Sequence, residues 1–158
     1  MSATHDLTEH YRGLVGREIH VGPWLTIDQQ RIDDFARVTG DLQWIHTDPE
    51  RAARESPYGC TIAHGFLTLS LLPYLTQSNH PDFFAENYPG MRLRVNYGLN
   101  KLRYPAPVLC NARIRARTAV HGVEEIGKGV QIVYLLTIEI DGGEKPACVA
   151  EQVVRVYP

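Results

Sequence analysis

The pattern of hydrophobic and polar positions changes near residue 90. Beyond it, apolar and polar side chains alternate in stretches rich in β-branched residues, which is typical of strands with one buried face. Four strands are predicted, over residues 91–104, 112–120, 130–140 and 147–156. The breaks between them are expected at Pro105-Ala106-Pro107, His121-Gly122 and Asp141-Gly142-Gly143, whose residues favour turns. A further strand is expected near residues 17–21.

Before residue 90 the apolar spacing is helical. The first helix is predicted over about residues 27–38, because Thr26 and Gln29 have the spacing of a capping box, in which both side chains satisfy free amides. Apolar residues then follow at i, i+3 and i+4, and Gly40 favours a C-terminal stop. This segment therefore predicts an amphipathic helix that ends in a loop.

Two more helices are expected before the strands. Asp48-Pro49 predicts a short one, with Asp as N-cap and Pro at the first helical position, which ends before Ser56-Pro57. A longer helix is predicted from about His64-Gly65, with a kink at Pro73, and it is apolar on nearly every face. We expect it to be buried, so the fold class is α+β, with an antiparallel sheet wrapped around one central apolar helix.

Composition restricts the class of protein. A chain of 158 residues with 44% hydrophobic and 22% charged residues fits one folded domain, and we expect a single domain over residues 1–158. The formal net charge of -2 provides no basic field, which makes nucleic acid an unfavoured partner. No internal repeat or linker divides the chain.

The cysteines and the N-terminus bear on the compartment. Cys60, Cys110 and Cys148 are odd in number and form no CxxC pair, so we expect a reducing environment and small apolar roles for them. The first residues lack the apolar core of a signal peptide, and no apolar run reaches the ~18 residues of a membrane span. A cytoplasmic protein without membrane association is predicted.

The loop after the first helix contains TGDLQWIH, with Asp41 and His46. A carboxylate and an imidazole that reach one water can share general acid and base work. The structural alternative is that Asp41 caps a turn and His46 bonds to a carbonyl, and for an isolated pair this alternative is the more common one. Neutral His46 is expected to be the working form near pH 7, and a neighbouring Asp41 can raise its pKa.

A second candidate is IAHGF, at the start of the buried helix. Free amides there suit an oxygen that becomes negative, and Gly65 would allow a carbonyl to approach. Equally, Gly65 can serve tight packing, and His64 can be a satisfied buried histidine. A metal site from Asp41, His46 and His64 lacks the spacing of known motifs, so we expect no metal and no cofactor.

Taken together, these motifs are familiar. GDLQWIH followed by His64-Gly65 resembles the MaoC-like family of (R)-specific enoyl-CoA hydratases, whose signature reads roughly Gly-Asp-x-Asn-Pro-(aliphatic)-His. NYGLNKLRYPAPV resembles the strand and turn that follow the central helix in this family, and IAHGF and KPACVAE look most like the NodN-like branch. The resemblance covers about residues 20–157 and implies a hotdog fold.

The resemblance also implies a reaction. Asp41 and His46 would activate the water that adds to a trans-2-enoyl thioester, and the Gly65 amide would stabilise the enolate oxygen. The product would be an (R)-3-hydroxyacyl thioester, carried by coenzyme A or acyl carrier protein, and the reverse reaction would be a dehydration. A homodimer is implied as well.

Further substrate-binding candidates are Gln43, Trp44, His64, Phe66, Asn96 and Asn100. The last two are on the strand after the helix and would hydrogen-bond either to substrate or to the partner chain. Gln43 and Trp44 replace the Asn-Pro of the signature. Trp44 would either narrow the acyl pocket or pack under the loop, and packing is favoured. The polar and aromatic residues 78–90 are a candidate lid.

Two other functions remain open. A hotdog thioesterase also polarises a thioester carbonyl, but it attacks C1 and usually relies on a single carboxylate. A noncatalytic acyl-thioester binding protein is the second alternative. The pair of Asp41 and His46 favours the hydratase over both.

Overall fold

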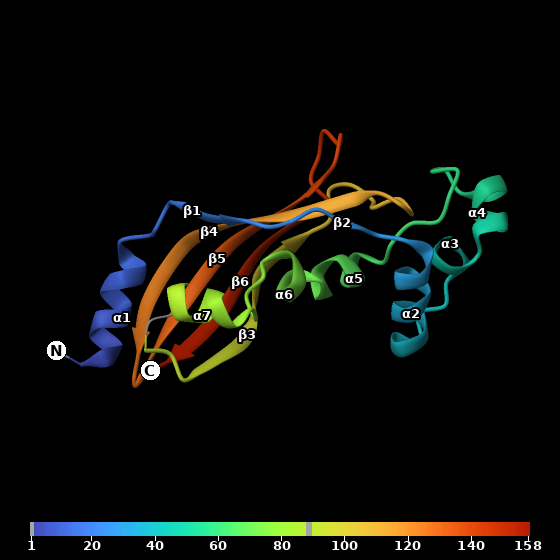
Figure 1. The fold of residues 1–158 in the computed structure, drawn as a ribbon. Coiled ribbons are helices and arrows are strands. Elements are labelled where there is room, and N and C mark those ends of the chain that lie inside the picture. The colour runs from blue at the N-terminus through green and yellow to red at the C-terminus, as the bar shows by residue number, and fades with distance from the viewer. Residues whose placement is uncertain (1, 88–89) are drawn as a thin grey trace.

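The computed structural model describes residues 2–87 and 90–158 and shows a curved sheet with helices against one face and beyond both ends (Figure 1). The elements in chain order are α1 (Ala3–Arg12), β1 (Glu18–Val21), β2 (Leu25–Thr26), α2 (Gln29–Thr39), α3 (Trp44–Thr47), α4 (Pro49–Glu55), α5 (Gly65–Ser70), α6 (Leu72–Leu75), α7 (Pro81–Asn87), β3 (Leu93–Arg103), β4 (Arg113–Ile126), β5 (Gly129–Ile140) and β6 (Cys148–Tyr157). The predicted α+β class is confirmed.

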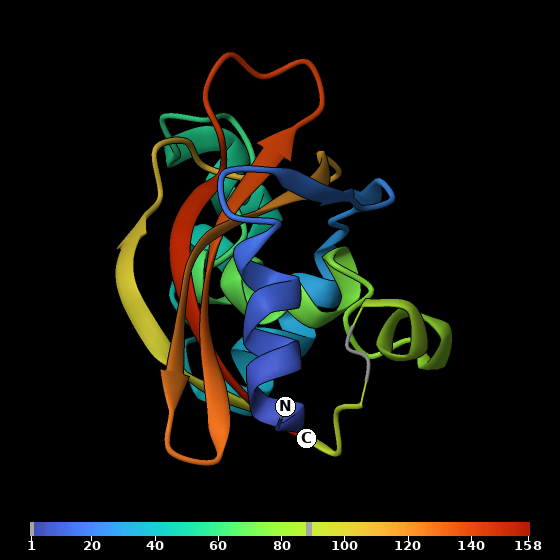
Figure 2. The same cartoon turned by 90° about the vertical axis from the view of Figure 1, so that its left-hand side faces the viewer.

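All strand pairs of the six-stranded sheet are antiparallel, in the order β1-β4-β5-β6-β3, and β2 also pairs with β4. The four predicted strands and the strand near residues 17–21 are confirmed, whereas β2 was not predicted. Figure 2 shows α1 and the central helices on the same side of the sheet, with β3 at its far edge. The sheet therefore has one covered face, and β3 is the edge strand at the end opposite β1.

One predicted turn is wrong. His121-Gly122 lies inside β4, where the register with β5 shifts between Val120 and Gly122. A β-bulge inserts an extra residue without ending the strand, so residues that favour turns can also lie within one. The chain reverses later, at Gly127, which has a φ of 54°. The predicted turn near Gly142 is confirmed, and its φ is 72°.

The core lies between the covered face of the sheet and the helices. Alternate residues of the central strands are fully buried, among them Ile114, Ala116, Ile132, Leu136 and Val154. They form one cluster with the buried side chains of the central helices, Leu67, Leu72 and Leu75. This alternation is the one expected for strands with one buried face.

The long buried helix is instead two short ones, α5 and α6, which meet at Leu71. Pro73 lies in the first turn of α6, not at a kink within a helix. Amide groups in a first turn have no partner within the helix, so the missing amide hydrogen of proline costs nothing there. Burial is also incomplete, because Phe66 is 65% exposed and Tyr74 is 54% exposed. The prediction of a helix covered on nearly every face is therefore wrong for this chain.

Two helix starts differ from the expected ones. Asp28, not Thr26, caps α2, and its carboxylate accepts from the Arg31 amide at 2.9 Å, because Thr26 belongs to β2. Helix α1 was not predicted, because its sequence is largely polar. It begins after Ser2, whose hydroxyl accepts from the His5 amide at 3.2 Å, and it buries Tyr11.

The other local predictions hold. Gly40 ends α2 in the left-handed region with a φ of 79°, and the Asp48 side chain caps α4. All three cysteines are free; Cys148 is buried and the other two are half-buried. In the part of the chain that the structure describes, no helix is both long enough and apolar enough to cross a bilayer.

Candidate active site

Two segments far apart in the sequence meet beside the start of α5. The Ile62 amide donates to the Ile45 carbonyl at 3.1 Å, which joins the segment before α5 to α3. The Ala63 amide donates to the Val108 carbonyl at 2.8 Å, which joins the same segment to the loop after β3. The backbone beneath the TGDLQWIH loop is therefore held from both sides.

His46 lies in α3, is 8% exposed and has one defined ring orientation. Its Nδ1 lies 2.7 Å from the Ile62 carbonyl oxygen. A carbonyl oxygen only accepts, so Nδ1 carries the hydrogen. In the neutral ring Nε2 then has a free lone pair and is available as a base.

His64 precedes α5, is 3% exposed and packs directly on His46. The two rings are stacked with centroids 3.8 Å apart and planes 25° apart. His64 Nε2 lies 3.0 Å from the backbone oxygen of Asp41, to which it donates. His64 Nδ1 is buried and has no hydrogen-bond partner among the described residues. This imidazole thus supports the ring of His46 and the backbone of Asp41 at once.

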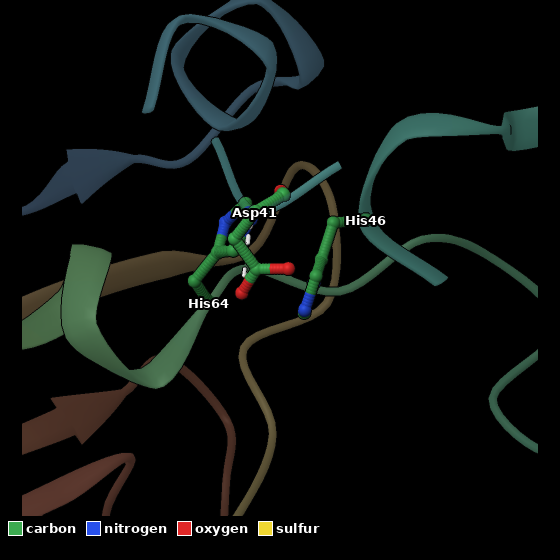
Figure 3. Close-up of side chains that lie close together, drawn as sticks. All are labelled: Asp41, His46 and His64. Atoms are coloured by element: carbon green, nitrogen blue, oxygen red, sulfur yellow. Dashed lines mark hydrogen bonds and ion pairs between the residues drawn. The ribbon is translucent and has the colours of Figure 1, made fainter. Parts of the chain in front are cut away.

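The Asp41 carboxylate completes the cluster (Figure 3). Its side chain is 55% exposed, and Oδ2 lies 4.0 Å from His64 Nε2. One ligand atom from each of Asp41, His46 and His64 lies within 4.8 Å of the other two. A single water can bridge two groups at this separation, because each of its hydrogen bonds spans about 2.8 Å.

The same three residues are a set that can hold a metal ion, although the sequence spacing did not indicate one. His46 Nδ1 is occupied by Ile62, and His64 Nε2 is occupied by the backbone of Asp41. His46 Nε2, His64 Nδ1 and the Asp41 carboxylate take part in neither of these two hydrogen bonds. The absence of a metal stays a prediction.

The net effect of the surroundings is to lower the pKa of His46 below its ordinary value of 6.5. Burial is the largest cause and lowers the pKa, while the bond to Ile62 raises it, the charge of His64 lowers it and the charge of Asp41 raises it. The expected effect of Asp41 is present but is outweighed by desolvation. His46 is therefore neutral near pH 7, as a base must be.

A pocket of about 350 Å³ lies beside His46. Its lining includes His46, Ile62, Gly65, Thr68, Tyr104 and Val108. A Cβ on Gly65 would lie 2.9 Å from the Tyr104 ring, so glycine is required for this ring to pack there. Burial raises the pKa of the Tyr104 phenol to about 12, which keeps it protonated. The packing role considered for Gly65 is thus present, and its amide remains a candidate for the oxyanion.

Gln43 and Trp44, which depart from the family signature, differ in their surroundings. Gln43 is exposed, and its backbone oxygen accepts from the His46 amide at 2.9 Å. Trp44 is half-buried, with the Arg51 guanidinium 4.3 Å from its ring centroid. Neither belongs to the pocket lining. Phe66 makes an edge contact with Tyr104, at 6.3 Å between ring centroids. Substrate contact by these residues stays a prediction.

Asn96 and Asn100 are not brought together with His46. Both are exposed on β3, and the Asn96 side-chain oxygen accepts from Gln152 Nε2 at 3.2 Å. Asn96 lines a separate groove of about 440 Å³ beside Leu69 and Leu72. Neither asparagine lines the pocket beside His46. Their role in substrate binding stays a prediction.

The candidate lid lies elsewhere. Residues 80, 82, 83, 86 and 87 line a pocket with His20, and the Tyr11 hydroxyl donates to the Asn87 carbonyl at 2.7 Å. Residues 88 and 89 of the segment lie outside the described part of the chain. None of the described residues of this segment lines the pocket of His46. The expectation that it borders the site is wrong for those residues.

Sequence reasoning missed several residues of the site. Gln29 was interpreted as part of a capping box, but its side chain bonds to the His46 carbonyl and to Thr61. Tyr104, Tyr58 and Thr68 line the pocket and were not selected. The useful signal was weak: Tyr104 directly precedes the Pro-Ala-Pro break that forms one wall.

The chain is similar to known proteins over most of its length. A family model described as "MaoC like domain" matches residues 11–140. The 3-hydroxyacyl-thioester dehydratase Z of Mycobacterium tuberculosis (strain CDC 1551 / Oshkosh) is 50% identical over 141 residues, which cover 89% of this chain and 89% of that protein. Nodulation protein N of Rhizobium leguminosarum bv. viciae is 40% identical over 143 residues, which cover 90% and 86%.

Among solved structures, the unliganded R-hydratase PhaJ1 from Pseudomonas aeruginosa is similar with a TM-score of 0.69 and 23% sequence identity. The match covers 93% of this chain and 84% of that one. The hotdog fold that the sequence implied is confirmed, as is the similarity to nodulation protein N.

Proposed function

This chain belongs to the MaoC-like domain family, and we propose that it is a hydro-lyase that interconverts trans-2-enoyl thioesters and (R)-3-hydroxyacyl thioesters. The observation that carries the proposal is the cluster of Asp41, oriented His46 and His64 beside a pocket that contains Gly65. The name of the 50% identical dehydratase supports the same reaction class.

In the hydration direction, one water would lie between the Asp41 carboxylate and His46 Nε2. As its oxygen bonds to C3, one water proton passes to this pair, and one proton passes from the pair to C2 on the same face. The pair ends with the number of protons it began with, so no other reactant is needed. Neutral His46 suits this exchange, because burial lowers its pKa.

Addition at C3 moves negative charge to the thioester oxygen. The Gly65 amide is our candidate donor to that oxygen, and it lies in the same pocket as His46. A donor that is fixed before the reaction stabilises the charge that develops in the transition state, which is usually a large part of catalysis. Tyr104, which packs on Gly65, forms the adjacent wall.

The first test is a pair of assays on the same protein and substrates. Crotonyl-CoA and longer enoyl-CoA analogues are followed by loss of the conjugated enoyl-thioester absorbance and, separately, by release of free thiol. A hydratase depletes the enoyl thioester without releasing thiol, whereas a thioesterase releases it. A folded protein that binds the thioester and turns it over in neither assay would be a binding protein.

The same assay with acyl carrier protein thioesters identifies the carrier.

We propose that the enzyme lies in the cytoplasm, since its three free cysteines fit a reducing compartment.

We also propose a homodimer joined at β3. This strand ends the sheet and exposes Leu93, Val95, Tyr97 and Leu99. An apolar edge strand is prone to pair with another chain.

Sedimentation velocity should give twice the mass of one chain. Leu99→Asp should give one chain, while Val38→Asp, at an exposed valine on α2, should leave the dimer intact. A wild-type monomer would contradict the proposal.

A further inference from the structure

We propose that Gln29 is a positioning residue of the active site, whose side-chain amide links the backbone of His46 to the segment that orients the His46 ring. The inference rests on the proposed function for its kinetic consequences. Gln29 is the first residue of α2, but Asp28 performs the capping, so the Gln29 side chain is free for another role.

The Gln29 amide has a single orientation. Its nitrogen donates to the His46 carbonyl at 2.7 Å and to Asp33 Oδ1 at 2.8 Å. Its oxygen accepts from the Thr61 hydroxyl at 2.5 Å. The reverse orientation would place the amide oxygen against two groups that only accept, so these contacts define which end is which.

The contacts of Gln29 close a loop around His46. From Gln29, one bond leads to the carbonyl of His46, whose ring donates to the Ile62 carbonyl at 2.7 Å. Ile62 follows Thr61, and the Thr61 hydroxyl returns to Gln29. One side chain therefore contacts both the residue that carries the reactive nitrogen and the segment that fixes the tautomer of its ring.

Other residue types would break this loop in defined ways. Methionine has nearly the same length and no hydrogen-bonding amide. Glutamate keeps an acceptor for Thr61 but, when ionised, puts negative charge against the His46 carbonyl. Thr61 is 2% exposed, so removing its acceptor leaves a buried hydroxyl unpaired. The matching change on the other side, Thr61→Val, removes the donor and keeps Gln29.

The consequence concerns the position of His46 Nε2 rather than the shape of the acyl pocket, because Gln29 is not part of the pocket lining. Displacing a catalytic group by about 1 Å can cost up to ~100-fold in rate. We therefore expect kcat to fall about tenfold or more in Gln29→Met, with KM within about threefold of wild type.

The experiment uses Gln29→Met, Thr61→Val, the double variant, and Gln30→Met as the matched control. Gln30 is the next residue on α2 and is exposed. We measure kcat, KM and thermal midpoint for each. Because the two residues act through one bond, the double variant should lose little more kcat than either single variant. Gln30→Met should retain kcat within about twofold, as expected for an exposed position.

Two kinetic results would overturn the inference. One is a wild-type kcat in Gln29→Met, whatever its thermal midpoint; the other is additive losses in the double variant. If Gln29→Met does not fold, Thr61→Val and Gln29→Glu carry the test. Gln29→Glu is expected to lose activity at neutral pH, because an ionised carboxylate cannot donate to the His46 carbonyl.

An activity-independent measurement separates this inference from the proposed function. The pKa and tautomer of His46 are followed by NMR of the imidazole nitrogens. In Gln29→Met a looser, more hydrated ring should titrate closer to its ordinary pKa of 6.5 than in wild type, where burial lowers it. If wild type hydrates no enoyl thioester but this shift occurs, the proposed function fails and the positioning role stands. An unchanged His46 titration would remove the positioning role.

Discussion

Two histidines, His46 of α3 and His20 of β1, line separate pockets of similar size. Figure 1 shows these two elements well apart. The pockets have volumes of about 350 Å³ and 410 Å³, and burial lowers the pKa of both imidazoles. The second pocket even contains two carboxylates, Asp82 and Glu86. Volume, a neutral imidazole and nearby acids therefore do not distinguish the two.

The hydrogen bonds around the rings do distinguish them. His46 Nδ1 is bound to the Ile62 carbonyl, and its neighbours His64 and Asp41 are bound to one another. His20 Nε2 is buried and has no hydrogen-bond partner among residues 2–87 and 90–158, and its ring meets Phe83 edge-on at 5.6 Å between centroids. A general base needs a fixed lone pair beside a fixed partner, and His46 alone of the two has both.

The largest expected effect is on turnover. Asp41→Ala and His46→Ala should each lower kcat/KM for crotonyl-CoA at least about 100-fold, the usual scale for a lost general acid or base. His20→Ala should stay within about twofold, since its ring is not organised for proton transfer. The loss of enoyl absorbance measures all three. Equal losses at His20 and His46 would abolish the distinction between the pockets.

Two glycines, Gly22 and Gly65, allow a comparison of the effect of an added Cβ on stability. A Cβ on Gly22 would lie 1.8 Å from the carbonyl oxygen of Leu75, which is backbone and cannot move aside. Gly22→Ala should therefore cost roughly 2 kcal/mol or more of unfolding free energy, measured in urea.

On the other side, Gly65→Ala meets only the Tyr104 side chain, which can swing outward. Its unfolding free energy should fall by less than about 1 kcal/mol, while kcat/KM falls about tenfold because the carbonyl can no longer approach the amide closely. In a Tyr104→Ala background, Gly65→Ala should cost no further stability but should still lower kcat/KM about tenfold. No further loss of kcat/KM in that background would mean that Gly65 serves packing alone.

The residues of the site that could be predicted from sequence obey local rules. Gly40 and Asp48 end and begin helices by backbone chemistry that involves only their neighbours, and the TGDLQWIH motif lies between them. Gln29 could not be assigned, because the same spacing satisfies a capping box, and its partner Thr61 lies 32 positions away. Where a side chain has two plausible hydrogen-bond partners, tertiary contacts determine which bond forms.

The same reason explains the errors in the fold. His121-Gly122 favours a turn locally, but pairing with β5 on both sides of it makes a bulge the better outcome. Phe66 and Tyr74 were expected to be buried because they are apolar, yet the chain leaves them exposed. The apolar composition indicates which side chains favour burial. It does not indicate whether this chain or a second copy of it buries them.

The pH dependence separates activity from stability. Because His46 must be neutral to act, kcat/KM should rise with pH to a plateau, with a midpoint below 6.5. For stability, the folded pKa values of His46 and His20 are both below their unfolded value, so the unfolded chain binds more protons and stability falls as pH drops through 6.5. His20→Ala should flatten part of the stability curve and leave the activity midpoint unchanged. A midpoint above 7 would contradict the burial of His46.

The smallest expected effect concerns the aromatic residue beside each imidazole. Phe83 touches the His20 ring, whereas Trp44 stands two positions before His46 and packs under the Arg51 guanidinium, outside the pocket lining. If Trp44 only supports α3, Trp44→Ala should cost about 1 kcal/mol of unfolding free energy from the lost cation–π contact and burial.

The ratio of kcat/KM between crotonyl-CoA and octenoyl-CoA should then stay within about twofold of wild type, because a residue outside the pocket does not discriminate chain length. Arg51→Met, which keeps an apolar contact and removes the charge, should lose about half as much stability and show the same ratio. A shift of the ratio in Trp44→Ala but not in Arg51→Met would instead make Trp44 part of the acyl wall in the functional assembly.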